Sequence, residues 1–331
     1  SAWLDYLSRF PFVSLYFRSS AQFPHQTAVV NGKKTGSDVN LYKLFTEQSF
    51  NLLKENGECG IVIPSGIYTD LGAKGLRDLL FNKTEITGLF CFENRKTIFE
   101  GVDSRFKFVV LTFVKSPNLP GFKNLEGLSE PQFPAEFMRH EVSELSNFPN
   151  SDSLYLHTDL IKKLSPDSQS IMEFKSAVDV KIAEKMLQFP LLGEQLENTW
   201  NLKLASEFHM TNESYLFKTE NSEDCFPLYE GKMIHQFSHN WGEPRYWVDE
   251  TESREALLGK NEDIGQLLDY QCYRLGFRDI ARNTDIRTLI STIIPRTFHG
   301  NKLPTVKVIN ESGGLYLSNA EQLFICAVWN S

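Results

Sequence analysis

The chain has 331 residues, a length typical of about two domains. Its composition, with 41% hydrophobic and 23% charged residues, is that of an ordinary globular protein, and 26 phenylalanines supply ample material for a core. The net charge of -8 is not typical of a general nucleic-acid binder, although it says nothing about a local basic patch.

Simple sequence features also exclude several locations and cofactors. The longest apolar runs, such as 108–114, are far shorter than a membrane span, and residues 1–10 lack the basic start and apolar core of a signal peptide. The five cysteines are scattered and form no CxxC pair, which indicates a reduced protein without a zinc site. We therefore expect a cytoplasmic protein that holds no metal and does not associate with a membrane.

The first predicted regular elements are a helix and a strand. Residues 1–30 are aromatic-rich and irregular in pattern. Apolar side chains then recur near helical spacing from Leu41 to Leu53, and Gly57 stands where a helix C-cap is expected. The apolar run CGIVIP that follows is typical of a strand buried on both faces of a largely parallel sheet. Pro64 ends this strand because proline cannot donate to the ladder.

Three further segments extend this pattern into part of an α/β sheet. Residues 73–81 have the pattern of a helix, and residues 85–92 and 106–115 have the pattern of strands. This order predicts one edge of an α/β sheet that finishes in an antiparallel pair. The elements are too few for a doubly wound domain, so we expect residues 1–115 to be the C-terminal portion of a domain whose first half lies upstream of Ser1.

The remaining sequence changes character twice. Residues 116–150 are rich in Pro, Asn and Gly, which predicts a linker with a short peripheral unit. Residues 151–331 contain an amphipathic helix at 176–189 and then short aromatic-rich segments, which predicts a separate, irregular α+β domain. The helical pattern at 319–331 stops within an apolar stretch, so we expect this domain to be truncated in its last helix.

The stretch NLYKLFTEQSFNLLKENGECGIVIPSG, residues 40–66, resembles a segment of gamma-class DNA N6-adenine methyltransferases. That class includes the TaqI-like enzymes and the fused type IIG restriction–modification proteins. The family pattern there is Asn-Leu-Tyr, a helix ending Leu-Leu-x-x-x-Gly and a strand ending in Ile-Pro. CFENRKTIFEGVDSRFKFVVLTF is similar to the next family block, whose phenylalanine matches Phe99. EFHMTNESYLF and FPLYEGKMIHQF resemble the target-recognition part of the fused methylases.

The resemblance implies a fold that combines α/β and α+β parts. Residues 1–115 would be the C-terminal part of a class I methyltransferase sheet, and residues 151–331 a DNA target-recognition domain. The intact bacterial enzyme would transfer a methyl group from S-adenosyl-L-methionine to adenine N6 in double-stranded DNA. The chain departs from the family because both the glycine-containing cofactor loop and the Asn-Pro-Pro-aromatic motif are missing from the sequence. We therefore expect no catalytic residue here, an incomplete cofactor site and no activity of these 331 residues alone.

The same resemblance assigns Asn40, Tyr42, Pro64 and Phe99 to the base and cofactor pocket. Adenine must leave the duplex to be methylated, and its flipped ring needs an aromatic face. Phe99 is the candidate for that face, since base stacking contributes ~1–3 kcal/mol and requires an exposed ring. The alternative is that Phe99 is one more core phenylalanine. Asn40 and Tyr42 would line the cleft or simply begin a helix with Asn40 as its N-cap.

Residues 271–302 form a positively charged segment within an acidic chain. They contain six Arg and Lys residues and two Asp residues, a net charge of six minus two, or +4. Arg274, Arg278 and Arg282 are four apart, a spacing that shares one face in a helix and also in a strand. The alternative is a solvated face with ion pairs to the two Asp residues. Cations contact phosphates and donors read base edges. The residues predicted to contact DNA are Lys232, His235, Gln236, Arg274, Arg278, Arg282, Arg287 and Arg296.

Two motifs suggest other chemistry. His235 and His239 have the spacing of a helical metal pair, but the Glu of HExxH and a third ligand are missing. The segment PDSQSIMEFK fits a nuclease pattern through Asp167, Glu173 and Lys175, although its gap is short for that hairpin. The preferred interpretation is a fragment of a DNA adenine methyltransferase. A non-catalytic DNA-specificity module and a nuclease remain as alternatives, and Mg²⁺ is expected only with a nuclease domain.

Overall fold

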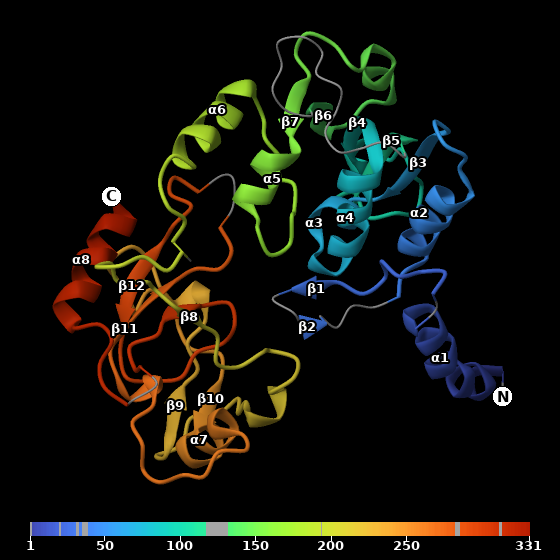
Figure 1. Cartoon of the computed structure of the whole chain (residues 1–331). Coiled ribbons are helices and arrows are strands. Elements are labelled where there is room, and N and C mark those ends of the chain that lie inside the picture. Colours follow the sequence, from blue (N-terminus) through green and yellow to red (C-terminus); the bar gives the residue numbers. More distant parts are fainter. Residues whose placement is uncertain are drawn as a thin grey trace. The chain divides into compact units, whose positions relative to one another are not determined.

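The computed structural model describes residues 2–19, 21–30, 33–34, 39–116, 132–192, 194–281, 285–310 and 313–331. The chain divides into two compact units, Ser1–Pro190 (unit 1) and Leu191–Ser331 (unit 2). The colours of Figure 1 follow the sequence, so unit 1 runs from blue to yellow-green and unit 2 from yellow to red. The observed boundary therefore follows Pro190 and differs from the predicted one near residue 150. No helix in the described part of the chain is long and apolar enough to cross a membrane.

Unit 1 is built on one mixed sheet with the strand order β3-β5-β4-β6-β7. β5 runs antiparallel to both β3 and β4, β6 runs parallel to β4, and β7 is antiparallel to β6. The strands are β3 (Glu58–Pro64), β4 (Thr84–Glu93), β5 (Lys107–Lys115), β6 (Gln132–Arg139) and β7 (Leu154–His157). Helices packed beside this sheet confirm the predicted α/β class, and β4 with β5 forms the predicted antiparallel pair.

Two of these strands come from segments predicted to lie outside the first domain. β6 belongs to the predicted linker, and β7 to the predicted second domain. Both bury apolar side chains in the same core as β4 and β5, including Phe133, Ala135 and Leu156. Composition alone predicted the linker, and composition carries no information about pairing between distant segments. Residues 117–131 of that predicted linker lie outside the described residues.

Strand β3 differs from the prediction of a strand buried on both faces. It stands at the margin of the sheet and pairs with β5 alone in the described part of the chain. Ile63 is its one buried residue, while Val62 is 53% exposed. An apolar run therefore marked a strand correctly but did not determine its place in the sheet, because edge and central strands share the same local pattern.

Helices α2, α4, α5 and α6 contact the sheet, whereas α1 lies away from it (Figure 1). α4 contributes Leu76, Leu79 and Leu80 to the core. Residues 1–30, expected to be irregular, contain the long helix α1 with Pro11 inside it. In α2 the buried residues are Lys43, Leu44, Thr46 and Glu47, whereas Leu41 is 71% exposed. The remaining elements are α1 (Ala2–Ser19), β1 (Val29–Val30), β2 (Lys33–Lys34), α2 (Leu41–Leu52), α3 (Gly66–Thr69), η1 (Leu71–Ala73), α4 (Lys74–Lys83), η2 (Asn94–Lys96), η3 (Val142–Asn147), α5 (Thr158–Leu164) and α6 (Ala177–Met186).

A fully buried arginine joins two distant parts of unit 1. The guanidinium of Arg77 donates to the carbonyl oxygens of Ile67, Asp70 and Ser168 at 2.6 to 2.8 Å. Nearby, the Ile171 amide donates to the Tyr68 carbonyl at 2.9 Å. Burial lowers the pKa of Arg77 to about 10, yet the side chain stays charged near neutral pH. A charged donor with several acceptors therefore fastens the segment after α5 to the turn after β3.

Unit 2 has short strands and long connections, which confirms the predicted irregular α+β character. One antiparallel sheet has the order β12-β11-β13-β8, and β9 pairs with β10 separately. Helix α8 packs Ile325 and Cys326 against Leu275 and Val306 of this sheet. The elements are β8 (Leu204–Ala205), η4 (Ser214–Leu216), β9 (Cys225–Pro227), η5 (Gly231–Met233), β10 (Trp247–Asp249), α7 (Glu250–Leu258), η6 (Asp269–Gln271), β11 (Arg274–Phe277), β12 (Ser291–Ile294), β13 (Thr305–Val306) and α8 (Asn319–Asn330).

Candidate functional site

The first candidate site is the edge of the unit 1 sheet where β3, β4 and β6 end. β3 and β4 are both antiparallel to β5, so they run in the same direction, and β6 is parallel to β4. Their carboxyl ends, at Pro64, Glu93 and Arg139, therefore meet at one edge. Ligands of open α/β sheets bind outside the carboxyl ends of the strands, so this edge is the expected position for chemistry.

Phe99 lies at this edge, in the loop that follows β4. Its amide donates to the Asn94 Oδ1 atom at 2.9 Å, and Asn94 Nδ2 donates to the carbonyls of Phe99 and Val102, each at 3.0 Å. Asn94 itself is fully buried, whereas the Phe99 side chain is 44% exposed. The buried amide therefore fixes the loop in a conformation that presents an aromatic ring to solvent.

Pro64 and Phe99 are both neighbours of Phe108. The Phe99 ring packs edge-on against Phe108, with 4.8 Å between ring centroids, and Phe108 is the register partner of Pro64 in the β3–β5 ladder. Pro64 and Phe99 are thus each next to Phe108, and their predicted place in a pocket stays a prediction. Phe99 contacts one neighbouring ring and is still 44% exposed, so it is not a core side chain.

Tyr42 lies beside the turn that follows β3. Burial, followed by the nearby Asp70 carboxylate, raises the pKa of its phenol to about 12, so the phenol stays protonated at neutral pH. Gly66 makes this approach possible: a Cβ atom there would stand 2.7 Å from the Tyr42 oxygen and 2.4 Å from Asp70 Oδ2. Asn40 takes the N-cap position of α2, but its exposed side chain makes no capping hydrogen bond.

Charged side chains line the same edge. Lys107 Nζ lies 2.5 Å from Glu173 Oε2, and the Tyr68 hydroxyl donates to Glu173 Oε1 at 2.9 Å. At the end of β4, Arg95 lies 2.9 Å from Glu93, and His140 lies 3.4 Å from it. Burial alone would raise the pKa of Glu93, but these hydrogen bonds lower it overall. The edge therefore holds ionised groups that are already paired.

Glu173 was also a candidate ligand of a nuclease site with Asp167 and Lys175. In the structure its carboxylate accepts hydrogen bonds from the Tyr68 hydroxyl and the Lys107 ammonium group at the sheet edge. Among the described residues no group of three or more His, Cys, Asp or Glu side chains is arranged to hold a metal ion. Glu173 is thus the ion-pair partner of Lys107.

In unit 2, Arg274 does not belong to a basic face. It is fully buried, its Nη1 atom lies 2.5 Å from Glu207 Oε1, and its Nη2 atom donates to the Thr297 carbonyl. This placement corrects its prediction as a DNA contact, because a buried guanidinium paired with a carboxylate is not available to phosphates. The spacing to Arg278 failed as a guide because β11 ends at Phe277 and Arg278 follows it.

His299 completes this buried cluster. Its amide donates to Glu207 Oε2 at 2.9 Å, its Nδ1 atom lies 3.1 Å from the Gly300 carbonyl, and its Nε2 atom lies 3.0 Å from the Thr305 hydroxyl. Burial lowers the pKa of His299 to about 4, although Glu207 opposes this shift. The imidazole is therefore neutral at pH 7, and Glu207 serves Arg274 as its counter-ion.

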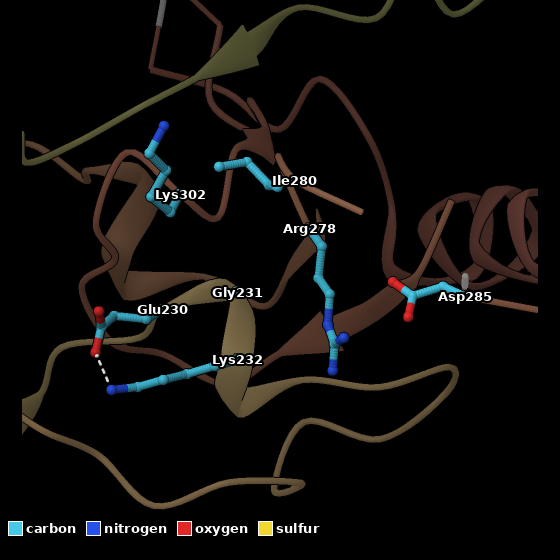
Figure 2. Close-up of a pocket in the computed structure, with 7 residues that line it drawn as sticks. All are labelled: Glu230, Gly231, Lys232, Arg278, Ile280, Asp285 and Lys302. Atoms are coloured by element: carbon cyan, nitrogen blue, oxygen red, sulfur yellow. Dashed lines mark ion pairs between the residues drawn. The ribbon is translucent and has the colours of Figure 1, made fainter. Parts of the chain in front are cut away.

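A pocket of about 450 Å³ gathers three cations on the surface of unit 2 (Figure 2). Lys232 Nζ lies 2.9 Å from Glu230, Lys302 Nζ lies 3.2 Å from Asp279, and Arg278 donates twice to the Ile234 carbonyl. Gly231 allows these segments to meet, because a Cβ atom there would stand 2.7 Å from the Lys302 carbonyl. The lining residues are Glu230, Gly231, Lys232, Arg278, Ile280, Asp285 and Lys302.

The other predicted DNA contacts are spread around this pocket and α8. The His235 and Trp241 rings lie 4.4 Å apart between centroids in a tilted arrangement, and Gln236 donates to the Asn330 carbonyl at 3.3 Å. Arg287 is exposed and donates to the Ser331 carbonyl at 2.6 Å, and exposed Arg296 lies 5.7 Å from the Tyr273 ring. Arg282 lies outside the described residues.

Sequence reasoning missed Asn94, Phe237 and Trp241. The role of Asn94 depends on carbonyls five and eight residues later, and no periodic pattern marks such a loop. Phe237 and Trp241 are 64% and 63% exposed, but an aromatic residue in a polar loop looks the same in sequence whether it is buried or exposed.

Comparison with known proteins gives this geometry a family context. Residues 16–99 match the family described as Eco57I restriction-modification methylase, which confirms for that segment the predicted resemblance to methylases of restriction–modification systems. The chain is 24% identical over 187 residues to the type II methyltransferase M.AccI of Acinetobacter calcoaceticus. That alignment covers 55% of this chain and 34% of the relative, so the chain spans about a third of the relative's length.

Solved structures of restriction enzymes are also similar to this chain. They are the type IIG restriction endonuclease BpuSI (TM-score 0.31, 12% identity, 90% of this chain and 39% of that one), the type IIL enzyme MmeI in complex with DNA (0.43, 9%, 82% and 36%) and a DrdV–DNA complex (0.41, 10%, 87% and 33%). All three TM-scores are below 0.5, so these structures assign no role to any residue of this chain.

Proposed function

We propose that this chain is part of a DNA methyltransferase of a restriction–modification system. Unit 1 would form one wall of the base pocket, and unit 2 would contact double-stranded DNA. The observation that carries the proposal is Phe99, which closes the segment that matches the methylase family and is held with an exposed ring at the carboxyl edge of the sheet.

In this function, Phe99 stacks on the target base after the base has left the duplex. A base inside the helix cannot reach an active site, so enzymes that modify it must extrude it and hold it by stacking and hydrogen bonds. Asn94 would act as a positioning residue, because its three hydrogen bonds fix the loop before the base arrives. Phe108, the register partner of Pro64, packs against the ring.

The cofactor would be S-adenosyl-L-methionine, which supplies an electrophilic methyl group. The described residues do not form a complete cradle for it, since Phe99 and Val62 leave the carboxyl edge open to solvent. The proposed acceptor is the N6 atom of adenine, the acceptor that the sequence resemblance implies, and the proposed location of a DNA-modifying enzyme is the cytoplasm.

The test is methyl transfer by the full-length protein. It is incubated with duplex DNA and S-adenosylmethionine carrying a labelled methyl group, and the DNA is digested to nucleosides and analysed by mass spectrometry. We expect N6-methyladenine, and no transfer by these 331 residues alone. Binding without methyl transfer would favour a DNA-specificity module, and a methylated cytosine would contradict the proposed acceptor.

A further inference from the structure

A tight turn in unit 2 displays two aromatic rings to solvent. The turn, residues 235–241, is closed by the His235 amide, which donates to the Ser238 carbonyl at 2.8 Å, and by the reverse bond at 3.0 Å. Phe237 at its tip is 64% exposed, and Trp241 at its end is 63% exposed and packs at a tilt against the His235 ring. Water-exposed rings of this size, grouped on one turn, are typical of a binding surface.

The rings are held in place by backbone bonds and a buried base. The Phe237 amide donates to the Ser291 carbonyl at 3.1 Å, and the Trp241 amide donates to the Met233 carbonyl at 2.9 Å. Met233 and Ile234, just before the turn, are buried in a cluster with Tyr229. The rings therefore present a fixed surface, so binding to them would cost little ordering entropy.

Phe237 also has a backbone conformation that bulky residues seldom adopt. Its φ angle of 59° lies in the left-handed region, which residues other than glycine, asparagine and aspartate seldom adopt because it is strained. Glycine would form the same turn without this strain. The retained ring is therefore consistent with a role outside the folding of the turn.

The cation-lined pocket of Figure 2 adjoins this turn. Lys232 precedes Met233, and Arg278 donates to the carbonyl of Ile234, the residue directly before the turn. Lys232 is paired with Glu230, and Lys302 with Asp279, so the pocket attracts phosphates only modestly. The aromatic surface is then the larger source of affinity, because stacking on a base does not depend on net charge.

We propose that Phe237 and Trp241 form a stacking platform for an unstacked nucleobase of DNA, with Lys232, Arg278 and Lys302 beside it for the adjoining phosphates. The inference rests on the proposed function, in which the target base leaves the duplex and so leaves neighbouring bases without a stacking partner. Carbohydrate and peptide ligands fit less well, because the platform is flanked by cations and a nucleotide offers both a flat base and a phosphate.

The test compares two oligonucleotides that differ only in their bases. One is a single-stranded 20-mer of thymidine, and the other is an abasic 20-mer with the same phosphates, each titrated into the 331-residue chain. Stacking predicts roughly ten- to hundredfold tighter binding of the thymidine oligonucleotide, and Phe237→Ala and Trp241→Ala should each reduce that preference. Their binding of the abasic oligonucleotide and its salt dependence should stay unchanged.

Tyr215→Ala is the matched control, since Tyr215 is an equally exposed aromatic residue of unit 2 outside the turn. Phe237→Trp should keep the preference for the thymidine oligonucleotide, because it retains an aromatic ring at this position. Equal affinity of the unmodified chain for both oligonucleotides, or no binding of either, would overturn the proposal. Methyl transfer by the full-length protein in that case would leave the proposed function standing, whereas absence of both would reject the two together.

Discussion

The two candidate surfaces are held in place in different ways. In unit 1, the loop that carries the exposed Phe99 starts at the end of the long β4–β5 ladder, and one buried residue, Asn94, fixes its conformation. In unit 2, β13 and β8 pair over two residues only, and buried charges and carbonyl contacts of Arg274 and Arg278 hold the loops together. A regular sheet sets where a loop begins, so one buried residue is enough to fix it, whereas an irregular domain depends on individual polar contacts throughout.

The difference determines which arginines are free to bind a ligand. Arg274 and Arg278 are four residues apart, yet one guanidinium is bonded inside the core and the other at the edge of a pocket. In an irregular domain, a cation can serve the fold as much as a ligand. Substitutions at the two sites should therefore differ in kind: Arg274→Ala in unit 2 should lower stability, whereas Phe99→Ala in unit 1 should lower activity.

The largest effect is expected from Arg274→Ala. Removing this guanidinium leaves the Glu207 carboxylate buried without its counter-ion, which should lower the free energy of unfolding of unit 2 by about 3–5 kcal/mol. Urea unfolding followed by the fluorescence of Trp247 and Trp329 measures this loss. The exposed Arg296→Ala is the control and should change stability by less than about 0.5 kcal/mol. Equal, small losses would show that Arg274 is not a buried structural residue.

A smaller effect is expected from pH, through His299. Its folded-state pKa of about 4 lies below the ordinary value of 6.5, so the unfolded chain takes up a proton first as the pH falls. The stability that neutral, buried His299 contributes to the fold is fully present above about pH 6.5. It is lost as the pH falls from about 6.5 to 4, by about 3 kcal/mol in total. Unfolding measured across that range should be less pH-dependent in His299→Gln. Identical profiles would contradict the assignment.

Phe99→Ala tests the sheet edge. In the full-length protein it should lower kcat/KM for methyl transfer roughly ten- to hundredfold, because one stacking face for the base is lost. Stability should fall by only about 1 kcal/mol, the value of an aromatic pair with Phe108. Val102→Ala, in the same loop and similarly exposed, is the control. An unchanged kcat/KM would remove Phe99 from the pocket.

The smallest effect is expected at the outer face of α2. Leu41 is 71% exposed, so Leu41→Ala should change the stability of this 331-residue chain by less than about 0.5 kcal/mol. Leu44 on the buried face is the comparison, and Leu44→Ala should cost about 2–5 kcal/mol. Chemical denaturation of both variants measures the difference. A large loss for Leu41→Ala would mean that another surface covers it.

The sequence predicted local elements better than their neighbours in space. The expected helix and strands correspond to α2, β3, β4 and β5, because hydrophobic period and turn residues act over a few positions. The pairing of β6 with β4 joins segments separated by more than 40 residues, and no local pattern encodes it. The same holds at the sites, since the partner of Arg274 lies 67 residues earlier in the chain.

The roles of individual residues also depended on neighbours in space that the sequence does not reveal. The family motifs place Pro64 and Phe99 at strand ends, and the structure puts each of them next to Phe108. The grouping of Lys232 with Arg278 and Lys302 depended on the close approach that Gly231 allows, which no charge count reveals. Sequence therefore identified the residue types at both surfaces, whereas only the fold determined which of them are exposed.

The junction made by Arg77 has a consequence for the order of folding. It ties Ile67 and Asp70 to Ser168, so its hydrogen bonds close a loop of about a hundred residues. Contacts of such separation form late, since the entropy of loop closure must be lost before they stabilise the chain. The local hairpin of β4 and β5 should thus gain protection from hydrogen exchange first during refolding. The amide of Ile171, which bonds to Tyr68 at the same junction, should gain it among the last.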